Sequence, residues 1–211
     1  MSRLKYDYIV IEGNIGTGKT SLASKIARDF DTRLILERFA DNPFLPKFYE
    51  NQSRYAFPLE LSFLADRYSQ LKNDLTNPEL FHQQTVSDYL LNKSLIFASI
   101  TLKDHELELY QKLFNIINPN LPKPELLVYL HKDVPKLKQN IRKRGREYEA
   151  NIKDDYLEKL EKGYWDFFKA QPGMKILIVD SNQLDFVNND KDYRKIIDLL
   201  EKEYPHGLHR F

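Results

Sequence analysis

The sequence contains no cysteine, so a disulfide framework and a thiolate metal site are both excluded. It also lacks long hydrophobic runs: the longest apolar stretches cover only a few residues, far short of the roughly 20 that cross a bilayer. The first such run begins at Tyr8, which leaves little room for a signal peptide ahead of it. We therefore expect a cytoplasmic protein without a membrane span.

An excess of either charge is missing too. The 32 lysines and arginines nearly cancel the 31 aspartates and glutamates, which leaves a formal net charge of +1. Such a balance gives no reason to expect a nucleic-acid polymer as partner. Any site for an anionic ligand must therefore be built locally.

Short β-branched apolar runs alternate with amphipathic segments along the chain. The strands are expected at Tyr8–Ile11, Leu34–Leu36, Gln84–Ser87, Leu126–Leu130 and Lys175–Val179. The helices are expected at Ser21–Arg28, about Pro43–Lys72, Leu91–Thr101, His105–Ile117, Val134–Arg144, Asp154–Ala170 and about Asp190–Glu203. This alternation predicts a single α/β domain over residues 1–211, with a doubly wound, five-stranded parallel sheet flanked by helices.

Glycine is scarce, with seven residues in 211, yet three of them lie in one short segment. This segment matches the pattern GxxxxGK followed by Ser or Thr, and it lies between a buried strand and a helix. It consists of Gly13, Asn14, Ile15, Gly16, Thr17, Gly18, Lys19 and Thr20. Its backbone N–H groups can bind phosphate oxygens, Lys19 can reach the β- and γ-phosphates, and the Thr20 hydroxyl can bind Mg²⁺. The pattern predicts a site for a nucleoside triphosphate.

The loop alone does not say whether ATP is hydrolysed, used as a phosphoryl donor or only bound. A GTPase would carry an Asn-Lys-x-Asp signature late in the chain, and none is present. A motor ATPase would be longer and would carry an apolar strand that ends in Asp-Glu, which is also absent. Both classes are therefore disfavoured.

Beyond this loop, a basic segment resembles the lid of the deoxynucleoside kinases, the family that contains deoxycytidine, deoxyguanosine and deoxyadenosine kinases. The segment Arg144–Glu149 is followed by Tyr156–Leu160, and the resemblance as a whole runs from Tyr8 to about Phe186. It implies a P-loop kinase fold with an arginine-rich lid at about residues 142–152.

Three arginines of this lid, Arg142, Arg144 and Arg146, lie around Gly145. Planar guanidinium groups can neutralise the charge on a transferring phosphoryl group, and Gly145 offers a flexible point for closure. A solvated basic helix end is the alternative interpretation. The family often has a further lid arginine where this chain has Asn140, and it is open whether Arg142 takes its place.

Glu37 follows the second expected strand, at the edge where ligands of parallel sheets bind. The family has its general base here, so the resemblance implies that Glu37 accepts the proton of an attacking 5′-hydroxyl. A salt bridge to a neighbouring lysine or arginine is the alternative.

The segment Phe48–Glu60 aligns without gaps with the family's sugar- and base-binding helices. The resemblance implies that Tyr49 and, from the lid, Glu149 share the sugar 3′-hydroxyl. Two polar partners on this hydroxyl would select nucleosides over unrelated alcohols. An amphipathic core position is the alternative for Tyr49.

Glu60 departs from the family, which usually has Gln at this base-contacting position. An ionised carboxylate only accepts hydrogen bonds, and guanine offers it two adjacent donors, N1–H and N2–H₂. A protonated Glu60 would instead serve adenine as Gln does. We expect a purine site, with the choice of purine open, and expect Arg67 on the same helix to flank the base.

A second departure lies at Val86–Tyr89, where the family usually shows Glu-Arg-Ser or Asp-Arg. That motif supplies a carboxylate for Mg²⁺ and an arginine that steadies the base catalyst. Here Ser87 takes the place of the carboxylate and Asp88 that of the arginine. Asp88 is still expected to hold Mg²⁺, directly or through water, and the arginine is missing. Lys93 stands where many members have Asp.

After the last expected strand, residues 180–186 resemble the loop that packs on the donor adenine, with Asp185 and Phe186 nearest to it. With this loop, the resemblance covers both the donor and the acceptor side of the expected site.

Together, these residues predict an enzyme that transfers a phosphoryl group from ATP, with Mg²⁺, to the 5′-hydroxyl of a deoxynucleoside, with a purine as the base. Its predicted catalytic residues are Glu37, Lys19, Arg144 and Arg146. The alternatives are a nucleoside monophosphate kinase such as thymidylate kinase, and a non-catalytic P-loop subunit. Family members commonly form homodimers, and the apolar stretch from Leu59 to Leu71 is a candidate interface.

Overall fold

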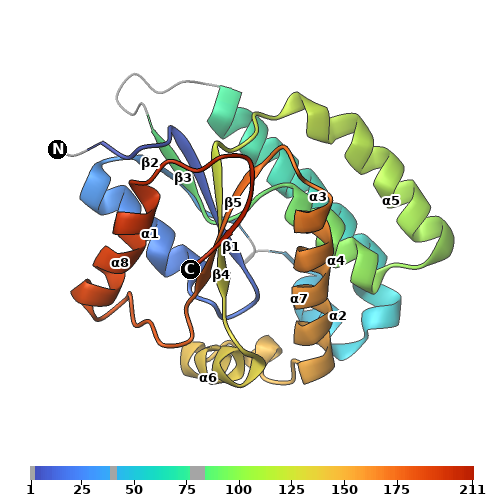
Figure 1. Cartoon of the computed structure of the whole chain (residues 1–211). Coiled ribbons are helices and arrows are strands. Elements are labelled where there is room, and N and C mark those ends of the chain that lie inside the picture. The colour runs from blue at the N-terminus through green and yellow to red at the C-terminus, as the bar shows by residue number, and fades with distance from the viewer. Residues whose placement is uncertain (1–2, 39–41, 77–83) are drawn as a thin grey trace.

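The computed structural model describes residues 3–38, 42–76 and 84–211, which form a six-stranded, all-parallel sheet between two layers of helices (Figure 1). The strand order is β2-β3-β1-β4-β5-β6. The strands are β1 (Tyr8–Gly13), β2 (Arg33–Ile35), β3 (Thr85–Ser87), β4 (Leu126–His131), β5 (Lys175–Asp180) and β6 (Gly207–Arg210).

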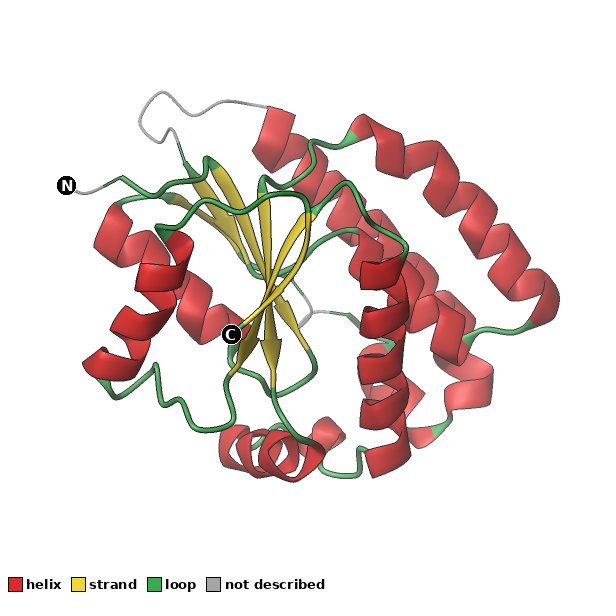
Figure 2. Ribbon diagram, in the orientation of Figure 1, coloured by secondary structure: helices red, strands yellow, loops and turns green. Residues whose placement is uncertain are grey.

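Helices cover both faces of this sheet (Figure 2). The α-helices are α1 (Lys19–Phe30), α2 (Leu45–Glu50), α3 (Gln52–Thr76), α4 (Asn92–Thr101), α5 (Asp104–Ile117), α6 (Val134–Arg144), α7 (Asp154–Lys169) and α8 (Asp190–Leu200). Helices α1 and α8 lie on one face, while α3, α4, α5 and α7 lie on the other (Figure 1). Among these described helices, none combines the length and the apolarity that a bilayer crossing needs.

The alternation of side chains along β1 explains why its sequence is almost entirely apolar. Ile9 and Ile11 pack against α1 and α8, whereas Tyr8 and Val10 pack against Tyr164 on α7. A strand buried on both faces needs apolar side chains at every position. The predicted α/β fold with a parallel sheet follows from this pattern and is confirmed.

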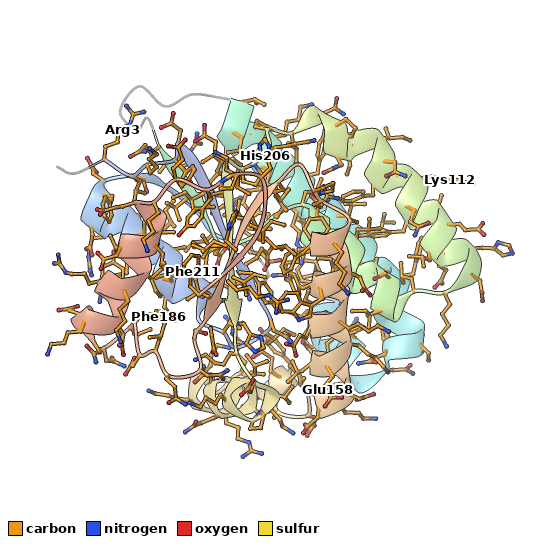
Figure 3. All side chains as sticks on the ribbon, viewed as in Figure 1. Arg3, Lys112, Glu158, Phe186, His206 and Phe211 are labelled. Carbon is orange, nitrogen blue, oxygen red and sulfur yellow. The ribbon has the colours of Figure 1, made fainter. Side chains whose placement is uncertain are left out.

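The predicted number of strands is wrong, because the C-terminal segment adds a sixth. Strand β6 pairs in parallel with β5, and Phe211 (labelled in Figure 3) continues the ladder through hydrogen bonds with Asp180 (2.8 Å) and Ile178 (2.9 Å). Leu208 is exposed at the sheet edge, and its strand neighbours in the sequence are Gly207, His209 and Arg210. Such an edge strand carries no apolar run that could reveal it.

The stretch expected to be one helix, from Pro43 to Lys72, is two. Helix α2 ends at Glu50, and the non-helical backbone of Asn51 (φ −146°, ψ 88°) separates it from α3. The apolar side chains of α3 that seemed suited to pairing two copies, including Leu59, Leu64 and Leu71, are buried inside the chain. They contribute to the subunit's own core, so the predicted homodimer cannot rely on them.

The carboxyl ends of the central strands bring three functional segments together. In the parallel register, Ser87 on β3 is paired with both Val10 on β1 and Ile35 on β2. Asp88 directly follows Ser87, Glu37 lies two residues after Ile35, and the phosphate loop begins three residues after Val10. The sheet thus places at one edge groups that are far apart in the sequence.

Helix α6 packs closely against Gly16 of the phosphate loop. The φ of this glycine, +87°, is left-handed, and a Cβ would lie 2.9 Å from the carbonyl oxygen of Leu137 and 3.0 Å from Ile141 Cγ1. We expect Gly16→Ala to cost ~1–3 kcal/mol of stability and to lower the Tm by several degrees. Thermal unfolding followed by circular dichroism measures this shift.

Gly173 is the matched control, because no atom of the described residues, apart from its own chain neighbours, lies within 4 Å of the place where its Cβ would be. Gly173→Ala should leave the Tm nearly unchanged. Equal Tm values for the two variants would contradict close packing at Gly16.

Candidate active site

The loop between β1 and α1 forms a cradle for phosphate. Gly16 and Gly18 adopt left-handed backbone conformations (φ +87° and +96°), and α1 begins directly afterwards at Lys19. The Lys19 ammonium donates hydrogen bonds to the carbonyl oxygens of Gly13 and Asn14, both at 2.9 Å. A bound triphosphate would offer this ammonium stronger acceptors, next to the N–H groups of the helix N-terminus.

Asn14 holds the loop in this shape. Its side-chain oxygen accepts a hydrogen bond from the Ile15 N–H, and its amide donates to the Leu157 carbonyl on α7, both at 2.8 Å. The Thr17 hydroxyl donates to the Asn14 carbonyl at 3.0 Å. The loop is therefore braced from inside and from the neighbouring helix.

Thr20 and Asp88 meet where α1 begins and β3 ends. Thr20 Oγ1 donates to Asp88 Oδ2 at 2.5 Å, and the backbone N–H of Glu37 donates to Asp88 Oδ1 at 2.7 Å. No three His, Cys, Asp or Glu side chains of the described ranges form a metal cage. A single hydroxyl and a single carboxylate nevertheless fit Mg²⁺, which keeps several waters and shares its ligands with substrate phosphates.

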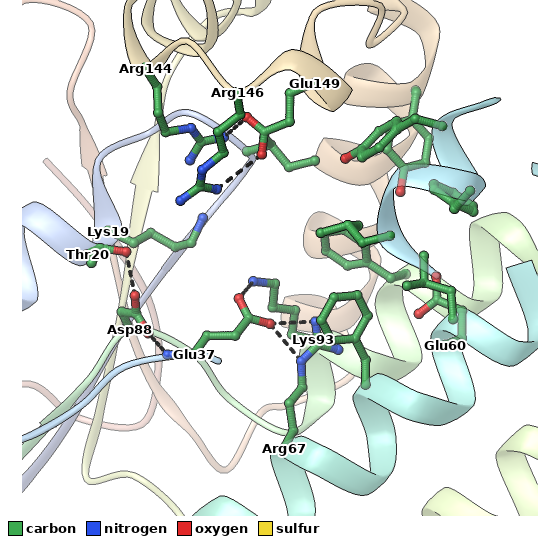
Figure 4. A pocket seen from close by; sticks show the side chains of 18 residues that line it. Lys19, Thr20, Glu37, Glu60, Arg67, Asp88, Lys93, Arg144, Arg146 and Glu149 are labelled. Carbon is green, nitrogen blue, oxygen red and sulfur yellow. Dashed lines mark hydrogen bonds and ion pairs between the residues drawn. The ribbon is translucent and has the colours of Figure 1, made fainter. Parts of the chain in front are cut away.

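Glu37 is held by two cations from different helices (Figure 4). Arg67 on α3 places Nε 2.8 Å and Nη2 2.6 Å from Glu37 Oε1, and Lys93 on α4 places Nζ 2.5 Å from Oε2. The three side chains are only 11%, 4% and 7% exposed for Glu37, Arg67 and Lys93. Glu37 therefore does form salt bridges to a lysine and an arginine, as the alternative interpretation expected. Both partners line the same pocket as Glu37, and neither is close to it in the sequence.

These charges decide the protonation state of Glu37. Burial alone would raise the pKa of this carboxyl, but Lys93 and Arg67 outweigh burial and lower it to about 2. The side chain is thus ionised at any physiological pH.

An apolar cavity opens beside Glu37. Its aromatic and aliphatic lining consists of Ile15, Leu45, Phe48, Tyr49, Leu59, Phe63, Phe97 and Tyr156. Its polar lining consists of Lys19, Thr20, Glu37, Glu60, Arg67, Asp88, Lys93, Arg144, Arg146 and Glu149. A narrow apolar space with polar groups at its two ends suits a flat ring that carries a polar edge.

Glu60 lies at the end of this cavity away from Lys19 (Figure 4). The residue is 2% exposed; Oε1 accepts the Thr101 hydroxyl at 3.0 Å, while Oε2 has no hydrogen-bond partner among the residues that the structure describes. Burial raises its pKa to about 7, although Arg67 and the Thr101 hydroxyl favour the ionised form. A buried oxygen without a partner is costly, so a ligand that donates to Oε2 would be stabilised.

Two of the three lid arginines, Arg144 and Arg146, converge on Glu149 above the phosphate loop (Figure 4). Arg144 Nη2 contacts Glu149 Oε2, and Arg146 Nη1 lies 3.2 Å from Oε1. The Tyr49 ring stacks on Tyr148 with 6.0 Å between centroids. The structure thus brings both predicted sugar contacts, Tyr49 and Glu149, to one cavity.

Other predicted donor contacts lie outside this cavity. Arg142 and Asp185 are exposed, and Phe186 is buried against the phosphate loop, where a Cβ on Gly18 would come within 3.0 Å of its ring (Figure 3). Asn140 donates a hydrogen bond to the Gly16 carbonyl at 2.8 Å. The contacts of Arg142, Asp185 and Phe186 with a nucleotide stay predictions.

Sequence reasoning gave no role to Glu12 or Lys93, which are both buried at the site. Glu12 accepts hydrogen bonds from the Leu90 N–H and the Tyr164 hydroxyl, each at 2.8 Å. Burial raises the pKa of Glu12, although Lys93 and Lys19 oppose this. A usable signal was present: Glu12 interrupts a buried apolar strand, Lys93 is the one charged residue of helix α4, and buried charges need partners.

Comparisons with known proteins agree with this geometry. Residues 9–204 match the model of the deoxynucleoside kinase family. The chain is similar to a deoxyguanosine kinase of Bacillus subtilis (strain 168), with 39% identity over 193 residues, which cover 90% of this chain and 93% of the relative. A deoxyadenosine/deoxycytidine kinase of the same organism is 29% identical over 206 residues, which cover 93% and 92%.

Solved structures show the same fold. The deoxyadenosine kinase from M. mycoides with bound dATP has a TM-score of 0.79 at 22% identity, over 92% of this chain and 98% of that chain. The same kinase with the products dCMP and a flexible dCDP bound has a TM-score of 0.79 at 24% identity, over 91% and 97%.

The charge of Lys19 generates a pH prediction. Burial and the nearby Lys93 lower the pKa of Lys19 to about 8, against the opposing effects of Glu12, Glu37 and Asp88. Only the ammonium attracts phosphate oxygens, so the affinity for MgATP should be fully present below pH 8. It should fall above that pH, by up to ~10-fold per pH unit. Calorimetric titration at several pH values between 7 and 9 measures this.

Lys19→Met is the control, because it removes the titrating group. Its affinity should be low already at pH 7 and should not fall further by pH 9. A decline as steep as in the unmodified protein would show that another group is responsible.

Proposed function

The chain belongs to the deoxynucleoside kinase family, and we propose that it transfers the terminal phosphoryl group of ATP to the 5′-hydroxyl of a purine deoxynucleoside, with guanine preferred over adenine. It is a kinase that phosphorylates a nucleoside. One observation carries the finer proposal: a single cavity has the phosphate loop and Glu37 at one end and the buried, unpaired oxygen of Glu60 at the other.

In the proposed reaction, the 5′-oxygen forms a bond to the γ-phosphorus while the bond between that phosphorus and the β,γ-bridging oxygen breaks. Lys19, Arg144 and Arg146 neutralise the charge on the transferring group. Mg²⁺, when bound by Thr20 and Asp88, supplies further positive charge there. ADP leaves with the bridging oxygen.

Glu37 takes the proton of the attacking hydroxyl. A carboxylate with a pKa of about 2 is a weak base, so it cannot ionise a free alcohol. The hydroxyl becomes acidic only as its oxygen bonds to phosphorus, and Glu37 then accepts the proton late in the transfer. Orientation of the carboxylate therefore matters more than its basicity.

Guanine is favoured because of what Glu60 can accept. Guanine N1–H and N2–H₂ are adjacent donors, and an ionised Glu60 presents an unpaired oxygen to such an edge. Adenine offers a donor beside an acceptor, which matches a protonated carboxyl instead. The similarity to a deoxyguanosine kinase at 39% identity supports the same preference.

The acceptor end of the cavity gives no comparable support to a nucleoside monophosphate kinase. Such an enzyme needs cations that remain available for the acceptor's own phosphate. Arg67 and Lys93, the cations nearest to Glu37, both contact its carboxylate, and this carboxylate would repel a phosphate placed beside it. A neutral 5′-hydroxyl fits beside this carboxylate better than a phosphate does.

Glu37→Gln tests the proposed base. The amide keeps the shape of the side chain but cannot take up the proton, so kcat should fall at least ~100-fold while MgATP binding persists. Turnover of deoxyguanosine and calorimetry with ATP measure the two effects. Asp66→Asn, an exposed change on α3, is the control. Unchanged turnover in Glu37→Gln would remove the base role.

Glu60→Gln tests the choice of base. Glutamine offers one acceptor and one donor, so kcat/KM for deoxyguanosine should fall about 10-fold or more while that for deoxyadenosine rises. In the unmodified enzyme, the ratio of deoxyguanosine to deoxyadenosine turnover should rise from pH 6 to pH 8, as Glu60 ionises with its pKa of about 7. In Glu60→Gln the ratio should not depend on pH. An unchanged ratio would exclude Glu60 from base recognition.

A further inference from the structure

Lys93 is a buried cation with a single strong contact. Its Nζ lies 2.5 Å from Glu37 Oε2 and 5.5 Å from the centroid of the Phe97 ring, and its side chain is 7% exposed. An ammonium carries three donors, and Glu37 is the only acceptor among the described residues that takes one. Because burying an ammonium is costly, a position with two unused donors calls for an explanation beyond packing.

The place of Lys93 in the cavity supplies that explanation. Lys93 lines the same cavity as Lys19 of the phosphate loop and Glu37. Figure 4 shows it bound to Glu37 on the side of the carboxylate that faces Lys19. This is the region where the acceptor oxygen must meet the γ-phosphate.

Arg67 differs from Lys93 in how firmly it is held. Its guanidinium donates to Ser94 Oγ at 2.7 Å as well as to Glu37, and it lies 4.6 Å from the centroid of the Phe63 ring. Lys93 has a flexible four-carbon stem and no second hydrogen-bond partner among the described residues. Of the two cations that contact Glu37, Arg67 is therefore the one held in place by further partners, and Lys93 is the one with freedom to follow the carboxylate.

We propose that Lys93 is a positioning residue for phosphoryl transfer: it holds the Glu37 carboxylate against Arg67 and turns a remaining N–H toward the acceptor oxygen. It does so in place of the arginine that the segment Val86–Tyr89 lacks. The inference rests on the proposed role of Glu37, but the contact between Lys93 and Glu37 can be tested without turnover.

The variants Lys93→Met and Lys93→Arg test this role. Methionine keeps most of the side-chain length and removes the charge, so kcat should fall about 10- to 100-fold, since misplacing a reacting group costs this much. The affinity for MgATP should persist, because Lys93 repels the Lys19 ammonium and lowers its pKa. Without Lys93, Lys19 keeps its charge and its contact with the phosphates. Arginine, which restores a cation, should recover most of kcat. Steady-state kinetics with saturating ATP and deoxyguanosine separates kcat from KM.

A pH profile distinguishes positioning from packing. With one cation gone, the pKa of Glu37 should rise toward its usual range, and kcat of Lys93→Met should decline as the pH falls toward 5. The unmodified enzyme and Lys93→Arg should show no such decline. ¹³C NMR titration of the Glu37 carboxyl measures the same pKa shift directly and needs no turnover. If no deoxynucleoside is phosphorylated, the proposed function fails, but this titration still tests the contact between Lys93 and Glu37.

Lys175→Met is the matched control, because Lys175 Nζ lies 5.3 Å above the Tyr6 ring, a similar lysine–aromatic contact far from Glu37. It should leave kcat and the pH profile unchanged. If Lys93→Met does not fold, Lys93→Ala assayed with added methylammonium replaces it, and recovery of kcat by the amine would support the proposal. Three results would each overturn the proposal. The first is full activity in Lys93→Met, and the second is an equal loss in Lys93→Met and Lys93→Arg with flat pH profiles. The third is that the amine does not restore kcat in Lys93→Ala.

Discussion

The site depends on one constraint, which is that charge taken out of water must be balanced within a few ångströms. Glu37 is almost completely buried, and it stays ionised because Arg67 and Lys93 contact its two oxygens. Lys93 in turn lies near Lys19, whose charge is balanced by Glu12, Glu37 and Asp88. Acids and bases alternate from the phosphate loop to the acceptor end, so a change at any one member alters the protonation or the position of the next.

The parallel sheet is what makes this balance possible. Strands β1, β2 and β3 run side by side, and the segments that follow them bring the phosphate loop, Glu37 and Asp88 to one edge. The backbone N–H of Glu37 donates to Asp88, so the carboxylate that we propose for Mg²⁺ also positions the segment that carries the proposed general base. Helices α3 and α4 then bring Arg67 and Lys93 across the same edge. A fold with these strands in another order would separate the donor side from the acceptor side.

Residues whose chemistry is local in the sequence could be predicted, and residues that act through distant partners could not. The alternation of short apolar runs with amphipathic segments predicted the α/β fold. The phosphate loop is a continuous motif between a strand and a helix, and the family was recognised from it together with the lid and the segments around Glu37 and Phe48–Glu60. Asp88 was identified at the end of a strand even though its motif is altered. Lys93 was noted only as a departure, because nothing in the sequence says that residues 37, 67 and 93 meet. Strand β6 was missed since its residues form no apolar run.

Arg67 interacts electrostatically with both Glu37 and Glu60, the carboxylates at the two ends of the cavity. Burial lowers the pKa of Arg67, but Glu37 and Glu60 outweigh burial and raise it, so this guanidinium responds to both carboxylates. A base that donates to Glu60 keeps that carboxylate ionised, and the negative charge strengthens the hold of Arg67 on the acceptor end. A nucleobase that requires Glu60 to be protonated removes that negative charge, so that Arg67 then interacts with Glu37 as its one remaining charged partner of the two. Under the proposed roles of Glu60 and Glu37, recognition of the base is coupled electrostatically to the proposed catalytic carboxylate through the buried side chain of Arg67.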